Sequence, residues 1–284
     1  MSDVRIEDVF VDVPGGSVFV RKWTADKSDN SPVVLLHDSL GSVELWRDFP
    51  GTLAQRLSRP VIAYDRLGFG RSSARQGLPS TDFIAEEARI YFPAIISALG
   101  LAKFSLFGHS VGGAMALVIA ATQVSGCQWV ASESAQAFVE PRTLTGILAA
   151  KEQFGRPEQL NRLMKWHGDK AQWVLDAWTQ TWLSPAFASW SLDPYLGHIR
   201  CPVLAIHGDL DEYGSVEFPN RIVSGVQGAS QLAILRECGH VPHREQQDQV
   251  LELVSGFAAS MESGHPDTLA PDNSNKPKPL RGTA

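Results

Sequence analysis

The sequence lacks several features by which whole classes of protein are recognised. Its only cysteines, Cys127, Cys201 and Cys238, are too few and too widely spaced along the chain for a disulfide framework or a cysteine zinc site. No run of 18 or more apolar residues is present to span a bilayer. The first residues, MSDVRIEDVF, have early acids and no apolar core of a secretory signal. We therefore expect free thiols in a reducing compartment, a cytoplasmic location and no membrane partner.

An excess of positive charge is also missing. With 25 Lys and Arg against 31 Asp and Glu, the formal net charge is −6, so no broad basic face is available for phosphate contacts. We therefore expect a small-molecule substrate and no nucleic acid as partner. The hydrophobic share of 44% is typical of a soluble globular protein. A length of 284 residues suits one sizeable core with a small added lid, and nothing in the composition indicates an oligomeric state.

Short apolar runs recur along the chain and end in polar or glycine-containing loops. Such runs are typical of parallel strands buried on both faces, and they occupy 32–36, 60–64, 103–107, 202–207 and, more weakly, 129–132. A hairpin is indicated at 6–13 and 17–23. Helix-length segments lie between the runs: 81–99, which Pro93 should kink or split and Gly100 should cap, and the small-residue segment 112–122. The alternation predicts an α/β fold with a mostly parallel central sheet of about eight strands flanked by helices.

Residues 136–192 interrupt this alternation. The segment holds five of the eight tryptophans, at near-helical spacing: Trp166, Trp173, Trp178, Trp182 and Trp190. It predicts a small helical lid inserted before the last two strands, between core parts 1–135 and 193–262. The rings could line a pocket, or they could simply pack the lid against the core, as aromatic rings at helical spacing usually do. Residues 263–284 are polar and proline-rich and predict a disordered tail.

Gly108-His109-Ser110-Val111-Gly112 matches the pattern G-x-S-x-G between a predicted strand and a predicted helix. That context is what a nucleophilic serine requires, because a sharp turn exposes the hydroxyl above the sheet and the flanking glycines let the backbone pass closely. The dipole of the following helix also points at a developing oxyanion. Ser110 is therefore the predicted nucleophile. His109 beside it is expected to pack in the turn, with a supporting or substrate-contacting role left open.

At these residues the chain resembles the α/β-hydrolase family, over about residues 5–260. His37-Asp38-Ser39-Leu40-Gly41 stands where that family has a His-Gly loop supplying an oxyanion-hole amide. The resemblance implies that the backbone N–H groups of Ser39 and Val111 hold the oxyanion, although Asp38 replaces the usual glycine. The loop beginning at Asp65 resembles the family's D-x-x-G-x-G-x-S loop, which we interpret as structural.

The resemblance also implies an acid and a base after the later strands. Gly208-Asp209-Leu210-Asp211 offers two aspartates, and the family's Gly-x-x-Asp spacing selects Asp211, with Asp209 as the alternative. Gly239-His240 fits the family's Gly-His loop, so His240 is the implied base. His243, beyond Pro242, is expected to pack or to bond nearby backbone. The order Ser110, Asp211, His240 is the one expected on this fold.

These residues predict a serine hydrolase in which His240 takes the proton of Ser110 and Asp211 orients the imidazole. The first hypothesis is a carboxylic-ester hydrolase (an esterase, lactonase or thioesterase) acting on a small, partly apolar substrate through an acyl-enzyme. The second uses the same residues to cleave carbon–carbon bonds in diketone-like ring-cleavage products. The third is a ligand-binding protein that has kept the fold and lost turnover. None of the three requires a metal or an organic cofactor.

Overall fold

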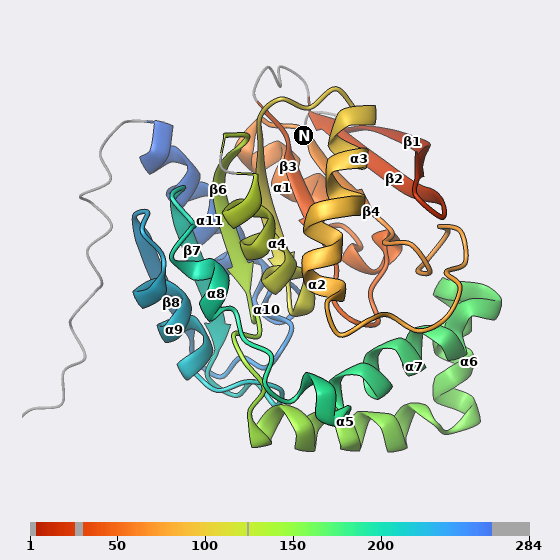
Figure 1. Ribbon diagram of the computed structural model, residues 1–284. Helices are drawn as coiled ribbons and strands as arrows, with labels where there is room; N and C mark the ends of the chain where they lie inside the picture. Colours follow the sequence, from red (N-terminus) through yellow and green to blue (C-terminus); the bar gives the residue numbers. More distant parts are fainter. Residues whose placement is uncertain (1–3, 26–30, 124, 263–284) are drawn as a thin grey trace, which may run out of the picture.

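A twisted eight-stranded sheet runs through the computed structural model, which describes residues 4–25, 31–123 and 125–262 (Figure 1). The strands are β1 (Val4–Val13), β2 (Gly16–Ala25), β3 (Val33–Leu36), β4 (Val61–Tyr64), β5 (Phe104–His109), β6 (Cys127–Glu133), β7 (Val203–Gly208) and β8 (Ser230–Leu235). Their order across the sheet is β1-β2-β4-β3-β5-β6-β7-β8. The first two pairings, β1 with β2 and β2 with β4, are antiparallel, and the remaining ones are parallel. The predicted fold class is therefore confirmed.

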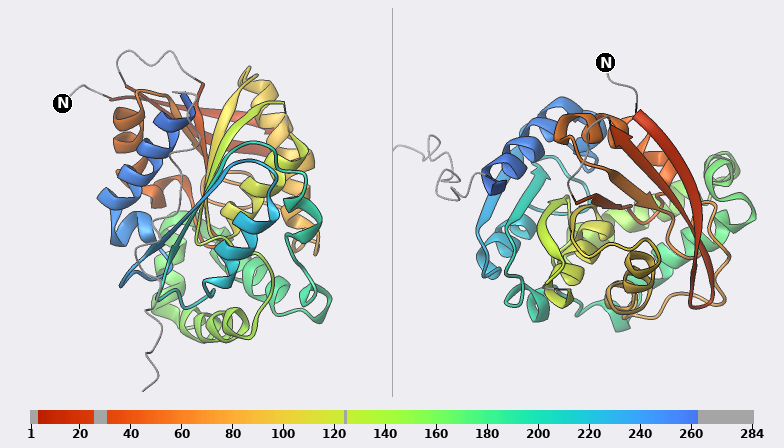
Figure 2. Two further views of the ribbon diagram at one scale, coloured as in Figure 1. Left: turned by 90° about the vertical axis from the view of Figure 1, so that its left-hand side faces the viewer. Right: turned by 90° about the horizontal axis from the view of Figure 1, so that it is seen from above.

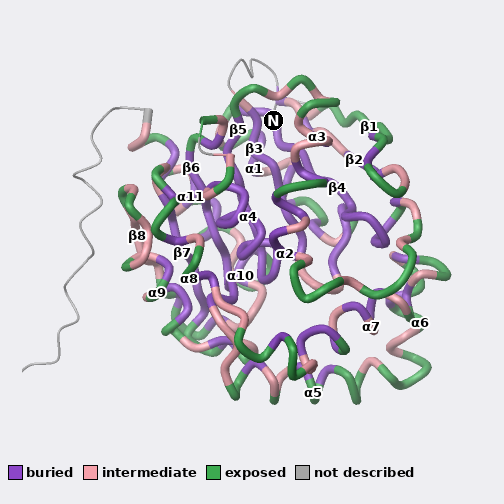
Figure 3. Tube along the Cα trace, in the orientation of Figure 1, coloured by how far each residue is buried: buried purple, intermediate pink, exposed green. Residues whose placement is uncertain are grey.

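Helices cover both faces of the sheet (Figure 2). One face packs on α1 (Phe49–Leu57) and α11 (Gln247–Glu262); the other packs on α4 (Val111–Thr122), α8 (Asp193–Leu196) and α9 (Glu217–Gly225). Successive residues of β3 point to opposite faces, so that Val33 joins one apolar cluster and Val34 the other. Because both faces are buried, the central strands read as continuous apolar runs, and Figure 3 shows them as a largely buried layer.

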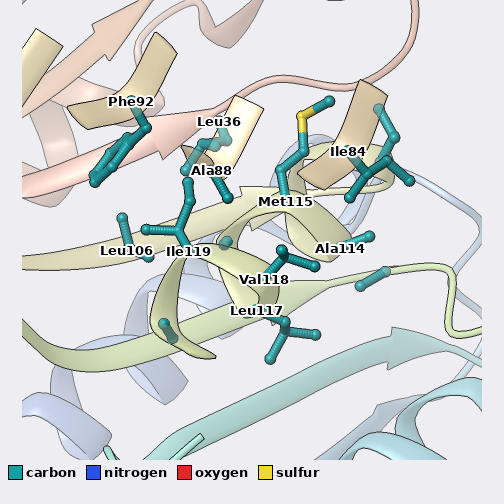
Figure 4. Close-up of a cluster of buried hydrophobic side chains, with 14 of the residues drawn as sticks. Leu36, Ile84, Ala88, Phe92, Leu106, Ala114, Met115, Leu117, Val118 and Ile119 are labelled. Atoms are coloured by element: carbon teal, nitrogen blue, oxygen red, sulfur yellow. The ribbon is translucent and has the colours of Figure 1, made fainter. Parts of the chain in front are cut away.

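Helix α4, which follows Ser110, is buried along nearly its whole length. Its side chains pack against Leu36, Leu106 and the segment from Ile84 to Phe92 (Figure 4). Gly112 lets the helix approach β3 closely, since a Cβ there would lie 2.1 Å from the carbonyl oxygen of Leu36. The small residues that predicted a tightly packed helix are therefore the ones that allow this approach.

The helix predicted at 81–99 is divided into three parts. A short α2 (Phe83–Glu86) leads into a π-helical turn, η2 (Glu87–Tyr91), and then into α3 (Phe92–Ala98). Pro93 is the second residue of α3 and has no N–H to donate to the turn before it, so the backbone widens there, at the residue predicted to kink or split the helix. Gly100 follows the helix with φ +66°, the left-handed conformation expected of a helix-ending glycine.

Three longer helices form the insertion between β6 and β7 and lie across the carboxyl edge of the sheet (Figure 1). They are α5 (Pro141–Phe154), α6 (Pro157–His167) and α7 (Ala171–Trp182), with short turns η3 (Gly168–Lys170) and η4 (Pro185–Phe187). All fall within the predicted range 136–192, and we call them the cap. A further turn, η1 (Val43–Trp46), precedes α1, and α10 (Pro242–Glu245) precedes α11.

At the end of the cap formed by α6 and η3, polar contacts hold it to the core. The ammonium of Lys170 donates to the carbonyl oxygens of Gly70 and Ser72, each at 2.8 Å. The ring of His167 accepts from the Gly70 N–H at 2.9 Å and lies 3.0 Å from the Leu40 carbonyl oxygen. The cap is thereby tied to the loop after β4 and to the loop after β3.

The three cysteines are free thiols, as predicted. Cys127, which begins β6, and Cys201, just before β7, are distant in sequence but have their sulfur atoms 3.8 Å apart. Within the described ranges, no helix is both long and apolar enough to cross a membrane. The predicted tail, 263–284, lies outside the described residues.

Candidate active site

Ser110 sits on a sharp turn between β5 and α4. Its φ of +57° and ψ of −124° are unfavourable for a residue with a side chain. A hydrogen bond to the neighbouring strand β6 holds the turn, because the Ser110 N–H donates to the Glu133 carbonyl oxygen at 2.8 Å. It also needs glycine on both sides, because a Cβ at Gly108 would lie 2.2 Å from the carbonyl oxygen of Gly112. The motif thus takes the conformation predicted for it.

The structure brings Ser110, His240 and Asp211 together from three separate loops. His240 Nε2 lies 2.9 Å from Ser110 Oγ, and His240 Nδ1 lies 2.8 Å and 2.9 Å from the two carboxylate oxygens of Asp211. With Nδ1–H donating to the carboxylate, Nε2 is left as the acceptor for the serine hydroxyl. This is the arrangement required for an imidazole to take a proton from a serine.

The electrostatics of the pair favour a charged imidazole. Burial alone would raise the pKa of Asp211, but His240 and backbone N–H groups hold that pKa below its ordinary value. The Tyr213 N–H, at 2.7 Å, and the Gly214 N–H, at 3.2 Å, both donate to its Oδ1. Burial opposes protonation of His240, yet Asp211 outweighs it and raises the pKa of that imidazole. A proton arriving on His240 is therefore stabilised where it forms.

Glu245, which the sequence did not single out, holds the loop that carries His240. Its two carboxylate oxygens accept from the N–H groups of Gly239, at 2.7 Å, and Val241, at 2.9 Å. These are the residues on either side of His240, so the carboxylate fixes the backbone from which the imidazole projects. An acid in the first turn after Pro242 was the available signal, since acids are enriched at helix starts.

The loop after β3 lies beside Ser110. Ser39 and Val111, the implied oxyanion donors, both line a cavity that adjoins the one holding Ser110, and Ser39 lines both cavities. His37 fixes the loop, because its Nε2 accepts from the Arg66 N–H at 3.1 Å and its Nδ1 lies 2.8 Å from the carbonyl oxygen of Asp38. Gly41 makes room for the side chain of Asp38, since a Cβ at Gly41 would lie 2.1 Å from Asp38 Oδ1. Asp38 therefore fits this loop only with glycine at position 41.

A second side chain contacts the nucleophile. The amide Nε2 of Gln136 donates to Ser110 Oγ at 3.2 Å, while its Oε1 is buried and has no hydrogen-bond partner in the described part of the chain. Gln136 follows β6, the strand beside the nucleophile strand. Its place at the carboxyl edge of the sheet was the signal that sequence reasoning missed.

The cavity in front of Ser110 has a volume of about 190 Å³, enough room for a small substrate. The cap contributes Trp178 and Trp182 to its wall, so two of the five tryptophans reach the site. Trp182 also packs on Phe187 and Trp190, at ring separations of 4.9 and 5.7 Å. Both interpretations of the cap tryptophans thus apply. The lining residues are Asp38, Ser39, Leu40, Ser110, Gln136, Thr143, Ile147, Phe154, Trp178, Trp182, Glu212, Tyr213, His240 and Val241.

Behind the site lies a buried cluster of Glu133, His109 and His243. Glu133 Oε2 is 2.6 Å from His243 Nδ1 and 2.9 Å from His109 Nδ1. Burial alone would raise the pKa of Glu133, but the two imidazoles lower it to about 2. The donor atoms lie within 4.8 Å of one another, so this trio has the spacing of metal ligands. The 2.6 Å contact with His243 is a hydrogen bond, whereas His109 Nδ1 lies 2.9 Å from the carboxylate without hydrogen-bond geometry. His243, expected to pack or to bond backbone, pairs with a carboxylate distant in sequence.

The remaining candidates lie away from the nucleophile's contacts. Asp209, the alternative acid, accepts from the Cys238 N–H at 3.4 Å. Asp65 accepts from the N–H groups of Val43, at 2.6 Å, and Arg71, at 2.7 Å, so it joins two loops. It is Asp211, and neither of these, that contacts His240.

The chain is similar in sequence or in fold to several known proteins. Over 106 residues the chain is 41% identical to the human 1-acylglycerol-3-phosphate O-acyltransferase ABHD5, a match that covers 36% of this chain and only 29% of that protein. It is 26% identical to a proline iminopeptidase of Heyndrickxia coagulans, over 89% of this chain and 98% of the relative. The structure superposes on the enol-lactonase of Burkholderia xenovorans with a TM-score of 0.69, covering 88% of this chain and all of that one at 18% identity.

A family comparison agrees with the resemblance noted from the motifs. Residues 33–253 match the alpha/beta hydrolase family. The match begins at β3 and ends within α11. It therefore includes the loops that carry Ser39, Ser110, Asp211 and His240. The chain belongs to the alpha/beta hydrolase family.

Proposed function

We propose that the protein is a carboxylic-ester hydrolase that forms an acyl-enzyme on Ser110. The observation that carries the proposal is the continuous hydrogen-bonded series from Ser110 Oγ through His240 to Asp211, at 2.9 and 2.8 Å, opening on a partly apolar cavity. A similar fold in an enol-lactonase supports an ester as substrate.

The geometry supports the following steps. Ser110 Oγ attacks the ester carbonyl while its proton passes to His240 Nε2, and Asp211 stabilises the imidazolium. The N–H groups of Ser39 and Val111 hold the oxyanion, each contributing about 3 kcal/mol. His240 then gives its proton to the departing alkoxide, which leaves as the alcohol. Water, deprotonated by the same imidazole, releases the acid and restores Ser110.

Turnover of short-chain p-nitrophenyl esters tests this proposal. Ser110→Ala should lower kcat by at least about a thousandfold, because it removes the hydroxyl that lies 2.9 Å from His240 Nε2. It should also abolish labelling by a fluorophosphonate probe. Ser189→Ala, at an exposed serine of the cap, is the matched control and should keep full activity and labelling. Unchanged turnover in Ser110→Ala would show that Ser110 is not the nucleophile.

The same assays separate the other hypotheses. Turnover of vinylogous diketo acids in place of esters would favour carbon–carbon bond cleavage, and absent labelling with tight small-molecule binding would favour a binding protein. L-Proline p-nitroanilide belongs in the panel because of the Heyndrickxia relative. Its turnover would show that the protein also cleaves amides, in which the leaving group is an amine and not an alcohol.

A further inference from the structure

We propose that the cavity in front of Ser110 selects substrates that carry a positively charged ammonium group, which Asp38 and Glu212 attract. The inference rests on the proposed function, since it names the class of ester that this site would accept. Three features of the cavity support it: the sign of its charges, an unpaired buried acceptor and its aromatic wall.

The charges that line the cavity are negative. Asp38 enters from the loop after β3 and Glu212 from the loop after β7. Among the described residues, no lysine or arginine lines the cavity, and neither carboxylate has a hydrogen bond or an ion pair. Arg244 shares a separate small space with Asp38 and donates instead to the Leu45 carbonyl oxygen at 2.6 Å. Against the effect of burial, nearby imidazoles and Arg244 hold the pKa of Asp38 below its ordinary value, so Asp38 stays ionised, but no lysine or arginine of the described residues lies on the cavity wall between the two carboxylates.

Gln136 independently indicates that the substrate has a hydrogen-bond donor on this side of the cavity. The side chain is only 5% exposed, and its Oε1 has no partner within the described ranges. The amide orientation follows from the neighbouring contacts, because Ser110 gives its hydroxyl proton to His240 and so must receive a proton from Gln136 Nε2. Oε1 is then the free acceptor. A buried acceptor without a partner is unfavourable. A rotation of the amide that turns Oε1 towards the cavity would let the N–H of a primary ammonium satisfy it, whereas butyrylcholine, which has no N–H, tests the charge alone.

The aromatic wall suits the same chemistry. Trp178, Trp182 and Tyr213 line the cavity, and Trp178 and Tyr213 pack with ring centroids 5.8 Å apart. Aromatic faces attract cations, most strongly where water is excluded. Burial, followed by the charges of Glu212, Asp211 and Asp38, raises the pKa of Tyr213 to about 12, so its phenol stays neutral. An anionic substrate would meet two like charges on the cavity wall.

Two pairs of esters place the charge on either side of the scissile bond. On the acyl side, p-nitrophenyl 6-aminohexanoate is compared with p-nitrophenyl heptanoate and with mono-p-nitrophenyl adipate as the anion. On the alcohol side, butyrylcholine is compared with 3,3-dimethylbutyl butyrate, in which carbon replaces nitrogen. In at least one pair, we expect kcat/KM to be on the order of 10-fold or more higher for the cation than for its neutral isostere. We expect the adipate ester to be slower than both.

Variants connect that preference to the two carboxylates. Asp38→Asn and Glu212→Gln should each reduce the ratio of cationic to neutral turnover several-fold. Glu217→Gln, at an exposed carboxylate outside the cavity, should leave the ratio unchanged. Preferential binding of butyrylcholine over its isostere to Ser110→Ala, measured by calorimetry, would support the proposal without any turnover.

The outcomes distinguish this inference from the proposed function. Efficient, Ser110-dependent hydrolysis of the neutral esters, with a cation-to-neutral ratio near one in both pairs, would overturn the inference and leave the proposed function standing. A ratio above one that survives replacement of both carboxylates would also overturn it. Absence of all ester turnover, together with charge-selective binding to Ser110→Ala, would overturn the proposed function and support the cation site.

Discussion

Replacing Glu133 by glutamine should destabilise the protein by about 3 kcal/mol at neutral pH. Glu133 is fully buried, and its Oε2 is shared by His243 at 2.6 Å and His109 at 2.9 Å. Its pKa falls from 4.5 to about 2 on folding, because the two imidazoles outweigh the effect of burial. By linkage, a fall of this size corresponds to about 3 kcal/mol in favour of the folded state. Glutamine removes the charge. It also places an NH2 group, which can only donate, beside an imidazole N–H that needs an acceptor.

The pH dependence follows from the sign of the change. Because the folded pKa lies below the unfolded one, the stabilisation is fully present above pH 4.5 and is lost as the pH falls towards 2. Urea unfolding followed by tryptophan fluorescence should therefore show the same deficit for Glu133→Gln at pH 7 and pH 5.5. The gap from wild type should narrow below pH 4.5. Glu252→Gln, at an exposed carboxylate of α11, is the control and should change little.

A deficit below about 1 kcal/mol at pH 7 would refute this reasoning. So would a deficit that stays constant from pH 7 down to pH 3.5. In either case Glu133 would stabilise the folded protein through packing and not through its charge.

Three further outcomes are expected. The acid limb of kcat/KM should lie above pH 6.5, because Asp211 raises the pKa of His240 and the base must be neutral to act; a pH–rate profile with its limb below 6.5 would contradict this. Glu245→Gln should lower kcat about 10-fold with little change in KM, because an amide cannot accept from both the Gly239 and Val241 N–H groups; equal kcat values would show that the loop holds itself. Gly112→Ala should lower the free energy of unfolding by more than about 2 kcal/mol, since its Cβ would lie 2.1 Å from the Leu36 carbonyl oxygen. Urea titration measures the change, and Gly197→Ala, where a Cβ would meet open space, is the control.

The parts of the site that depend on chain order could be predicted from the sequence. Ser110, Asp211 and His240 each follow a buried strand, and parallel strands bring their carboxyl ends to one edge of the sheet. The same burial on both faces made the central strands recognisable as apolar runs. Pro93 likewise predicted a break in its helix, because the missing N–H is a property of the residue itself.

Contacts between distant segments could not be predicted in this way. His243 and Glu133 are 110 residues apart in sequence, and nothing local to either indicates the other. Gln136 reaches Ser110 only because β5 and β6 are neighbours in the sheet. Which cap tryptophans line the cavity likewise depends on how α7 packs over the core. These features follow from tertiary packing, about which periodicity and motif spacing carry no information.

The backbone of Ser110 has a consequence for the history of this chain. At φ +57° and ψ −124° a serine sits where glycine would be relaxed, and the difference is on the order of 1–3 kcal/mol. Most of that strain would be relieved by a change that also removes the hydroxyl. A lineage released from selection for the nucleophile would therefore drift towards glycine at this position and become more stable as it lost activity. Serine at position 110 therefore lowers the stability of the fold, a loss that the proposed function would explain because it requires the hydroxyl.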